Sequence, residues 1–144
     1  MISINPYFNF PGNTEEAFNF YKSVFGGDFA MLMRFKDTPE AGKTPPQDLD
    51  KLMHISLPVG KGTVLMATDA TESMGQKVVV GNNIHLAIHT DSEAEADKIH
   101  SALSKGGKVT LPMSKQFWGS YFGMVTDKFG IQWMISYDNI SPQN

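Results

Sequence analysis

The chain has 144 residues, of which 41% are apolar and 19% charged, as is typical of one compact domain or two small, closely packed modules. A net charge of −3 gives no reason to expect nucleic acid or an anionic membrane surface as a partner, and the absence of cysteine excludes disulfides, thiolate catalysis and zinc–thiolate sites. No apolar segment approaches the roughly 20 residues that span a bilayer. The N-terminus lacks a signal-peptide pattern, so the expected location is cytoplasmic.

The first half of the sequence predicts a strand, a helix and three further strands. Asn13 can cap the helix, and Ala17, Phe18 and Tyr21 begin an apolar stripe at helical spacing. Gly26 and its neighbouring glycine end the helix. The polar, proline-rich segment 36–51 is expected to be a loop or a lid. The strands are expected at 2–10, 29–35, 52–58 and 63–68.

The second half repeats this order. Asp91 and Ser92 can cap a helix whose inner stripe includes Ala96 and Leu103, and a second Gly-Gly pair ends it. Strands are expected at 84–90, about 108–112, 121–126 and 132–137. The expected fold class is therefore α+β, with two βαβββ modules (about 1–75 and 82–138) in a single domain over 1–144. Each mixed sheet would carry a helix on one face, and the other faces would form a cup between the modules, where a ligand would bind.

Histidines supply the first candidate site residues. Strand alternation in segment 84–90 directs Ile84, Leu86 and Ile88 toward the helix, and His85 and His89 toward the cup. The alternative interpretation is that both histidines are partly exposed polar-face residues. Their Cα atoms would lie roughly 13 Å apart, which makes a shared metal difficult.

Other polar side chains have plainer interpretations. His54, near Ser56 on another strand, is more typical of a hydrogen-bonded structural residue than of a ligand, and His100 is expected on the solvent side of the second helix. Arg34 either holds an anionic ligand or, as we prefer, pairs with a nearby acid. Two acids at strand ends, Asp69 and Asp127, are expected to cap backbone groups.

Several segments together carry a family resemblance. The pattern YFNFPGNTEEAFNFYKSVFGG, then LMRF, MHISL, VLMATDA and GNNIHLAI, and finally FWGSYFGMVTDKFGIQWMI resembles the PhnB-like branch of the vicinal oxygen chelate superfamily. This superfamily includes glyoxalase I, bleomycin-resistance proteins and extradiol dioxygenases. The resemblance implies paired βαβββ modules around a cup-shaped site, commonly in a homodimer. Some members of this branch are labelled demethylubiquinone methyltransferases, but this sequence has no Gly-rich nucleotide loop after a strand.

The resemblance also implies positions for a divalent metal, on the first and last strands of each module. These positions fall at about Pro6, Met66, His85 and Met134, so only His85 keeps a ligand-type side chain. Proline and methionine cannot hold a hard divalent ion. The sequence therefore predicts that the metal site is largely lost, although His54 could supply a second ligand in a non-standard geometry.

The C-terminal stretch combines core and site residues. Alternation assigns Trp133 to the core beneath the helix, Gln132 and Met134 to the cup, and Trp118 to its rim. The leading hypothesis is a protein that binds a small, partly apolar molecule without a cofactor. The cup would be lined by Met66, His85, His89, Trp118, Gln132 and Met134.

Two alternatives stay open, and with them the question whether the protein is an enzyme. The first is a lyase, isomerase or dioxygenase that depends on a divalent metal ion, with His85 as ligand and His54 or His89 as a second ligand or base. The second is a cup without a ligand, in a fold that serves only dimerisation.

Overall fold

The computed structural model describes residues 1–138 and divides into two compact units, Met1–Val79 and the part that begins at Val80. Each unit has the order strand, helix, strand, strand, strand, so the predicted α+β fold with two βαβββ modules is confirmed. The cup, and the union of both modules in a single domain, stay predictions. No helix among the described residues is long and apolar enough to cross a bilayer.

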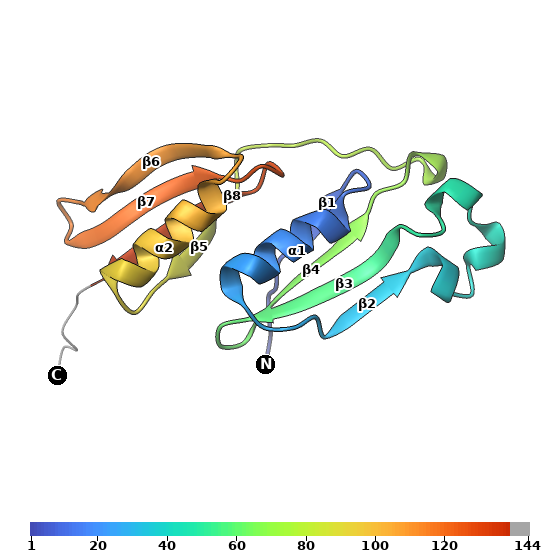
Figure 1. The fold of residues 1–144 in the computed structure, drawn as a ribbon, viewed down its shortest axis with the longest axis horizontal. Coiled ribbons are helices and arrows are strands. Elements are labelled where there is room, and N and C mark those ends of the chain that lie inside the picture. Colours follow the sequence, from blue (N-terminus) through green and yellow to red (C-terminus); the bar gives the residue numbers. More distant parts are fainter. Residues whose placement is uncertain (139–144) are drawn as a thin grey trace. The chain divides into compact units, whose positions relative to one another are not determined.

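The first unit is a four-stranded mixed sheet with one helix (Figure 1). The strand order is β1-β4-β3-β2, with β1 parallel to β4 and the other neighbours antiparallel. The predicted loop 36–51 contains three short 3₁₀ turns. The elements are β1 (Tyr7–Phe10), α1 (Thr14–Phe25), β2 (Met31–Arg34), β3 (Leu52–Val59) and β4 (Thr63–Asp69).

Helix α1 packs through the predicted stripe, because Ala17, Phe18 and Tyr21 are fully buried. Phe8 of β1 meets the Phe18 ring edge-on, with centroids 6.2 Å apart. Asn13 precedes the helix, but its side chain makes no capping bond. The carboxylate of Asp69 caps the helix in its place: it accepts from the backbone N–H of Thr14 at 3.0 Å and from that of Leu52 at 2.8 Å.

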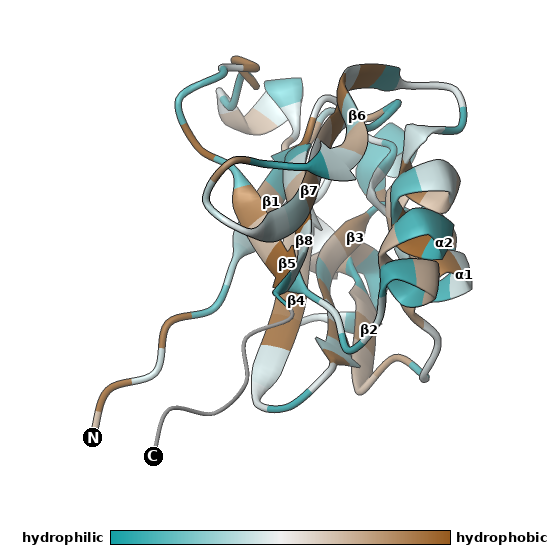
Figure 2. Cartoon of the chain, turned by 90° about the vertical axis from the view of Figure 1, so that its left-hand side faces the viewer, coloured by the Kyte–Doolittle hydropathy of each residue, from teal (hydrophilic) through white to brown (hydrophobic). Residues whose placement is uncertain are grey.

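The second unit repeats this topology, with strand order β5-β8-β7-β6 and β5 parallel to β8 (Figure 1). Ser92 caps the helix as predicted, since its hydroxyl accepts from the backbone N–H of Glu95 at 3.0 Å. Figure 2 shows that the strands and the helices both mix hydrophobic and hydrophilic residues. The elements are β5 (Leu86–His89), α2 (Glu93–Ser104), β6 (Lys108–Lys115), β7 (Ser120–Thr126) and β8 (Gln132–Asp138).

The position predicted for His100 was wrong, because this side chain is buried beneath α2 and only 8% exposed. Its Nε2 atom lies 3.1 Å from the carbonyl oxygen of Leu111 on β6. Gly123 on β7 leaves room for the imidazole: a Cβ at this glycine would lie 3.0 Å from the ring. A glycine opposite a helix therefore allowed a polar side chain to enter the core.

The predicted limits of the strands also differ from the structure, and β1, β5 and β6 show why. β1 begins at Tyr7 because the four residues from Tyr7 onward pair with β4, and β5 begins at Leu86 for the same reason against β8. β6 continues past Pro112 to Lys115, because two irregularities in its pairing with β7 accommodate a residue without an N–H on an edge strand.

Candidate functional sites on the helix-free sheet faces

Each sheet has one face beneath its helix and one face that the helix of its own unit does not cover. The strand register decides which side chains occupy the second face, since directly paired residues project to the same side. In the first unit Tyr7, Met66, Ser56 and Met31 form a row across all four strands. We call this surface, together with His54, the first helix-free face.

A histidine–tyrosine pair is the polar feature of the first helix-free face. The Tyr7 hydroxyl lies 3.2 Å from Nδ1 of His54, and the two ring centroids are 5.7 Å apart. Tyr7 and His54 stand on β1 and β3, so the pair reaches over the intervening strand β4. Burial raises the pKa of Tyr7, which keeps the phenol neutral and able to donate a hydrogen bond. The expected hydrogen-bonded role of His54 is therefore observed, with Tyr7 as its partner.

The second unit has a corresponding surface. His89, Ser136, Phe122 and Ser114 form a row across its four strands, and Met134 pairs with Met124 on the same side. The second helix-free face denotes His89, Phe122, Met124, Met134 and Ser136.

A histidine–serine pair is the polar feature of the second helix-free face. Nδ1 of His89 lies 2.9 Å from the hydroxyl of Ser136 and 3.9 Å from a carboxylate oxygen of Asp138. The side chain of His89 is 72% exposed, whereas Ser136 is buried. The imidazole is therefore held at one nitrogen while most of the ring stays accessible.

The predicted site residues divide between the two units. Met66 lies half-buried on the first helix-free face, and His89 and Met134 lie on the second. Gln132 donates from its side-chain amide to the carbonyl oxygen of Ile84 at 2.8 Å. His85 is exposed and precedes β5. That these residues line one cup stays a prediction.

Trp118 lies on the hairpin between β6 and β7 and is 56% exposed. Its ring meets that of Phe122 edge-on at 5.8 Å and that of Phe117 at 5.0 Å. Trp118 is thus joined to the second helix-free face through Phe122, which agrees with a position at the edge of that surface.

The strand register sets other residues beside the two methionines than those at the predicted first-strand positions. The residue beside Met66 is Tyr7 and not Pro6, and the residue beside Met134 is Ala87. Sequence reasoning therefore missed Tyr7, although its alternation with the buried Phe8 and Phe10 already assigns it to the other face.

The residues at the family's metal positions do not fit a hard divalent ion. Met66 and Met134 offer thioethers, which suit soft metals, and Tyr7 and Ala87 beside them add no carboxylate or imidazole. Within residues 1–138, no three side chains among His, Cys, Asp and Glu come close enough to hold a metal ion together. The chemistry of these faces therefore rests on imidazole, hydroxyl and apolar groups.

Arg34, which could have bound an anionic ligand, is already paired with protein groups. Its guanidinium donates to both carboxylate oxygens of Glu15, at 3.0 and 2.7 Å, and to the carbonyl oxygen of Asp50 at 2.9 Å. The preferred interpretation, an ion pair with a nearby acid, is confirmed.

The fold places the chain in a structural class. A glyoxalase-related enzyme from Fulvimarina pelagi is 20% identical, with a TM-score of 0.63, over 100% of this chain and 94% of its own. At this identity the likeness shows the fold alone, which is that of glyoxalase/bleomycin-resistance proteins. The predicted fold class is confirmed.

The family follows from the sequence itself. Residues 2–136 match the family described as 3-demethylubiquinone-9 3-methyltransferase, and the chain belongs to this family. Protein PA1353 from Pseudomonas aeruginosa is 36% identical, with a TM-score of 0.83, over 96% of this chain and 98% of its own. A PhnB protein from Bacillus cereus is 23% identical, with a TM-score of 0.75, over 94% and 99%. The predicted PhnB-like resemblance is confirmed.

Proposed function

We propose that the protein binds a small, partly apolar molecule against its helix-free faces. One observation carries the proposal: each face combines methionine and aromatic side chains with one histidine that is hydrogen-bonded to a hydroxyl. The ligand-binding walls would comprise the residues predicted from the sequence and the pair found here. They are Met66, His85, His89, Trp118, Gln132 and Met134, together with Tyr7 and His54.

The physical basis is the apolar area that these faces expose. Met31 is 48% exposed and Tyr7 46%, and burial of apolar surface contributes about 25 cal/mol per Å². Methionine side chains adapt their shape to a ligand, and an imidazole offers a directional hydrogen bond. No metal is needed for such binding. The methyl transfer named in the family's description is not extended to this chain, because its sequence has no Gly-rich nucleotide loop.

A homodimer in the cytoplasm is the working form that we propose, in line with the family resemblance. The same apolar faces would also suit a second copy of the chain, so the experiment must separate ligand binding from dimerisation.

The test is a thermal-shift screen of aromatic and amphipathic metabolites on the full-length protein. A ligand at 100 times its dissociation constant adds about 2.7 kcal/mol, which raises the melting temperature by several degrees. His54→Ala and Met134→Ala should each reduce the shift. The control is Met74→Ala, which removes an exposed methionine from a 3₁₀ turn outside both helix-free faces. A broad panel without any stabilisation, or hits that every variant binds equally, would remove the support for the proposal.

Light scattering after size exclusion resolves the remaining alternative. If Met134→Ala dissociates a dimer and no compound in the panel stabilises the protein, the helix-free face serves dimerisation only.

A further inference from the structure

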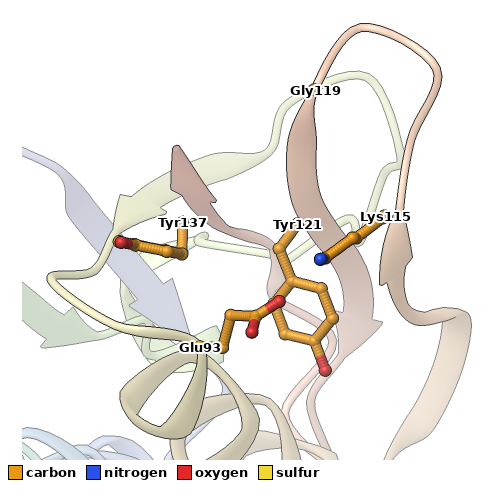
Figure 3. A pocket seen from close by; sticks show the side chains of 5 residues that line it. All are labelled: Glu93, Lys115, Gly119, Tyr121 and Tyr137. Carbon is orange, nitrogen blue, oxygen red and sulfur yellow. The ribbon is translucent and has the colours of Figure 1, made fainter. Parts of the chain in front are cut away.

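A small cavity in the second unit lies on the opposite side of the sheet from the second helix-free face. Its volume is about 190 Å³, and five residues line it: Glu93, Lys115, Gly119, Tyr121 and Tyr137 (Figure 3). The Tyr121 hydroxyl donates to Asp97 of α2, which identifies this side of the sheet as the one beneath the helix. The cavity is therefore distinct from the surface in the proposed function.

The cavity exists because the sheet extends past the start of α2. Tyr121 pairs with Lys115 on one side and with Tyr137 on the other, so the three side chains form a row across β6, β7 and β8. The helix begins at Glu93 and its first turn forms a wall of the cavity. Gly119 leaves the hairpin side open, since a Cβ there would meet nothing within 4 Å.

Two opposite charges face this cavity without neutralising each other. Within the part of the chain that the structure describes, neither Glu93 nor Lys115 forms an ion pair. In the view of Figure 3 the side chain of Glu93 comes from the start of α2 and that of Lys115 from β6, and both line the cavity together with Tyr121. A carboxylate and an ammonium group that line one cavity with two tyrosines match a ligand that carries the reverse pair of charges.

The neighbouring polar groups are already engaged. The Tyr121 hydroxyl lies 2.5 Å from a carboxylate oxygen of Asp97, which raises the pKa of Tyr121 to about 12 and keeps the phenol neutral. The side chains of Ser92 and Glu95 accept from backbone N–H groups at the start of α2. The charges offered to a ligand are therefore those of Glu93 and Lys115, and the aromatic rings offer their faces.

We propose that this cavity binds a small zwitterion, namely an α-amino acid or a short amino-carboxylate. Its carboxylate would pair with Lys115, its ammonium group with Glu93, and its apolar part would lie against the rings of Tyr121 and Tyr137. A cavity of about 150 Å³ holds benzene, so about 190 Å³ accommodates a body of the size of proline or valine.

The experiment is a titration of the ¹⁵N-labelled full-length protein with L-proline and L-valine, followed by NMR chemical shifts. Isobutyrate and isobutylamine serve as probes that carry only one of the two charges. The proposal expects shifts at the five lining residues and much weaker effects from the single-charge probes. Lys115→Met and Glu93→Gln should each weaken binding at least about tenfold. The matched control Lys108→Met removes an exposed lysine from the same strand and should leave the affinity unchanged.

Three results would overturn the proposal. They are the absence of shifts at millimolar concentrations, binding that survives both Lys115→Met and Glu93→Gln, and single-charge probes that bind as well as the zwitterions. The amide spectrum of each variant reports whether it is folded, so loss of binding is not confused with loss of structure. The thermal-shift screen in the proposed function addresses other residues, and the two ideas can fail separately.

Discussion

The two units share a topology but differ in the side chains that form their cores. Beneath α1 the core is aromatic, with Phe8, Phe18 and Tyr21 in mutual ring contact. Beneath α2 it contains the imidazole of His100 and the indole of Trp133, whose N–H donates to Asp127 at 2.9 Å. The same strand order therefore forms from two different sets of side chains, which indicates that patterning and turn residues determine this topology more than any one core packing does.

The helix-free faces show the same contrast nearer to function. Met66 and Met134 occupy corresponding places, each paired with a residue of the first strand of its unit. The polar pairs do not correspond: one joins Tyr7 and His54 across β4, and the other joins residues on adjacent strands. The methionines are thus duplicated between the two faces, while the polar pairs are not. We therefore expect the two faces to contribute different hydrogen bonds to the binding of a ligand.

The largest expected effect on the free energy of unfolding is that of a substitution at Gly107, which we compare with one at Gly26, since each glycine follows the helix of its unit. A Cβ at Gly107 would lie 2.3 Å from the carbonyl oxygen of Thr126 and 2.8 Å from the carbonyl carbon of Asp127. Because backbone atoms cannot yield, Gly107→Ala should destabilise the protein by about 3 kcal/mol. Gly26 faces open space but has a φ of +79° and a ψ of −166°, a region that essentially only glycine adopts, so Gly26→Ala should cost about 2 kcal/mol through backbone strain alone. Urea unfolding followed by circular dichroism measures both.

Gly42→Ala is the control, since this glycine has neither a close neighbour nor a positive φ. Its free energy of unfolding should change by less than about 0.5 kcal/mol. Equal costs at Gly26 and Gly107 would contradict the idea that close approach of the backbone distinguishes the second unit.

Much of this fold could be predicted because its signals are local. The stripe of Ala17, Phe18 and Tyr21 and the glycines after both helices set the helices, and alternation separated Trp133 from Met134 correctly. Strand ends were predicted less well, because a strand ends where its neighbour ends and the sequence does not show that neighbour. His100 was misplaced for a related reason, since the space for it depends on a glycine 23 positions later.

The site depended on contacts that no local pattern reports. The pair of Tyr7 and His54 depends on the strand order β1-β4-β3, which brings the two side chains to the same face. Alternation alone does not reveal this order. The cavity beside Tyr121 depends on where α2 begins relative to the ends of β7 and β8. Asp69 and Asp127 were interpreted correctly as capping residues, since the backbone groups that they bind lie at nearby turns or at the ends of the same sheet.

A smaller effect distinguishes the units by pH. Hydrogen bonding to Arg34 lowers the pKa of Glu15 below its ordinary value of 4.5, so the stabilisation is complete above that value and is lost as the pH falls. The pKa of Tyr121 is raised from 10.0 to about 12 by Asp97, so its contribution is complete below pH 10 and is lost as the pH rises toward 12. Glu15 therefore gives the first unit an acid-sensitive contact, and Tyr121 gives the second unit an alkaline-sensitive one. Burial raises the pKa of Tyr7 as well, so the first unit also holds an alkaline-sensitive group.

Urea midpoints measured across pH test this difference. Glu15→Gln should flatten the acid side of the stability profile, and Tyr121→Phe the alkaline side, each without altering the other. Asp97→Asn serves as a control that should return the phenolate titration toward pH 10. If Glu15→Gln changed the alkaline side instead, the assignment of the acid sensitivity to Glu15 would be wrong.

The smallest expected effect concerns His85, which the family resemblance predicts as a metal ligand. This side chain is exposed and precedes β5, so His85→Ala should change the free energy of unfolding by less than about 0.5 kcal/mol. By contrast, His89→Ala removes the contact with Ser136 and should cost about 1 kcal/mol.

The metal content of the protein purified without a His-tag tests whether His85 has a metal-binding role. Within residues 1–138 no three side chains among His, Cys, Asp and Glu lie close enough to hold an ion together, so wild type and His85→Ala should both retain far less than one divalent ion per chain. A near-stoichiometric ion that His85→Ala loses would instead favour a metal-dependent lyase, isomerase or dioxygenase with His85 as a ligand.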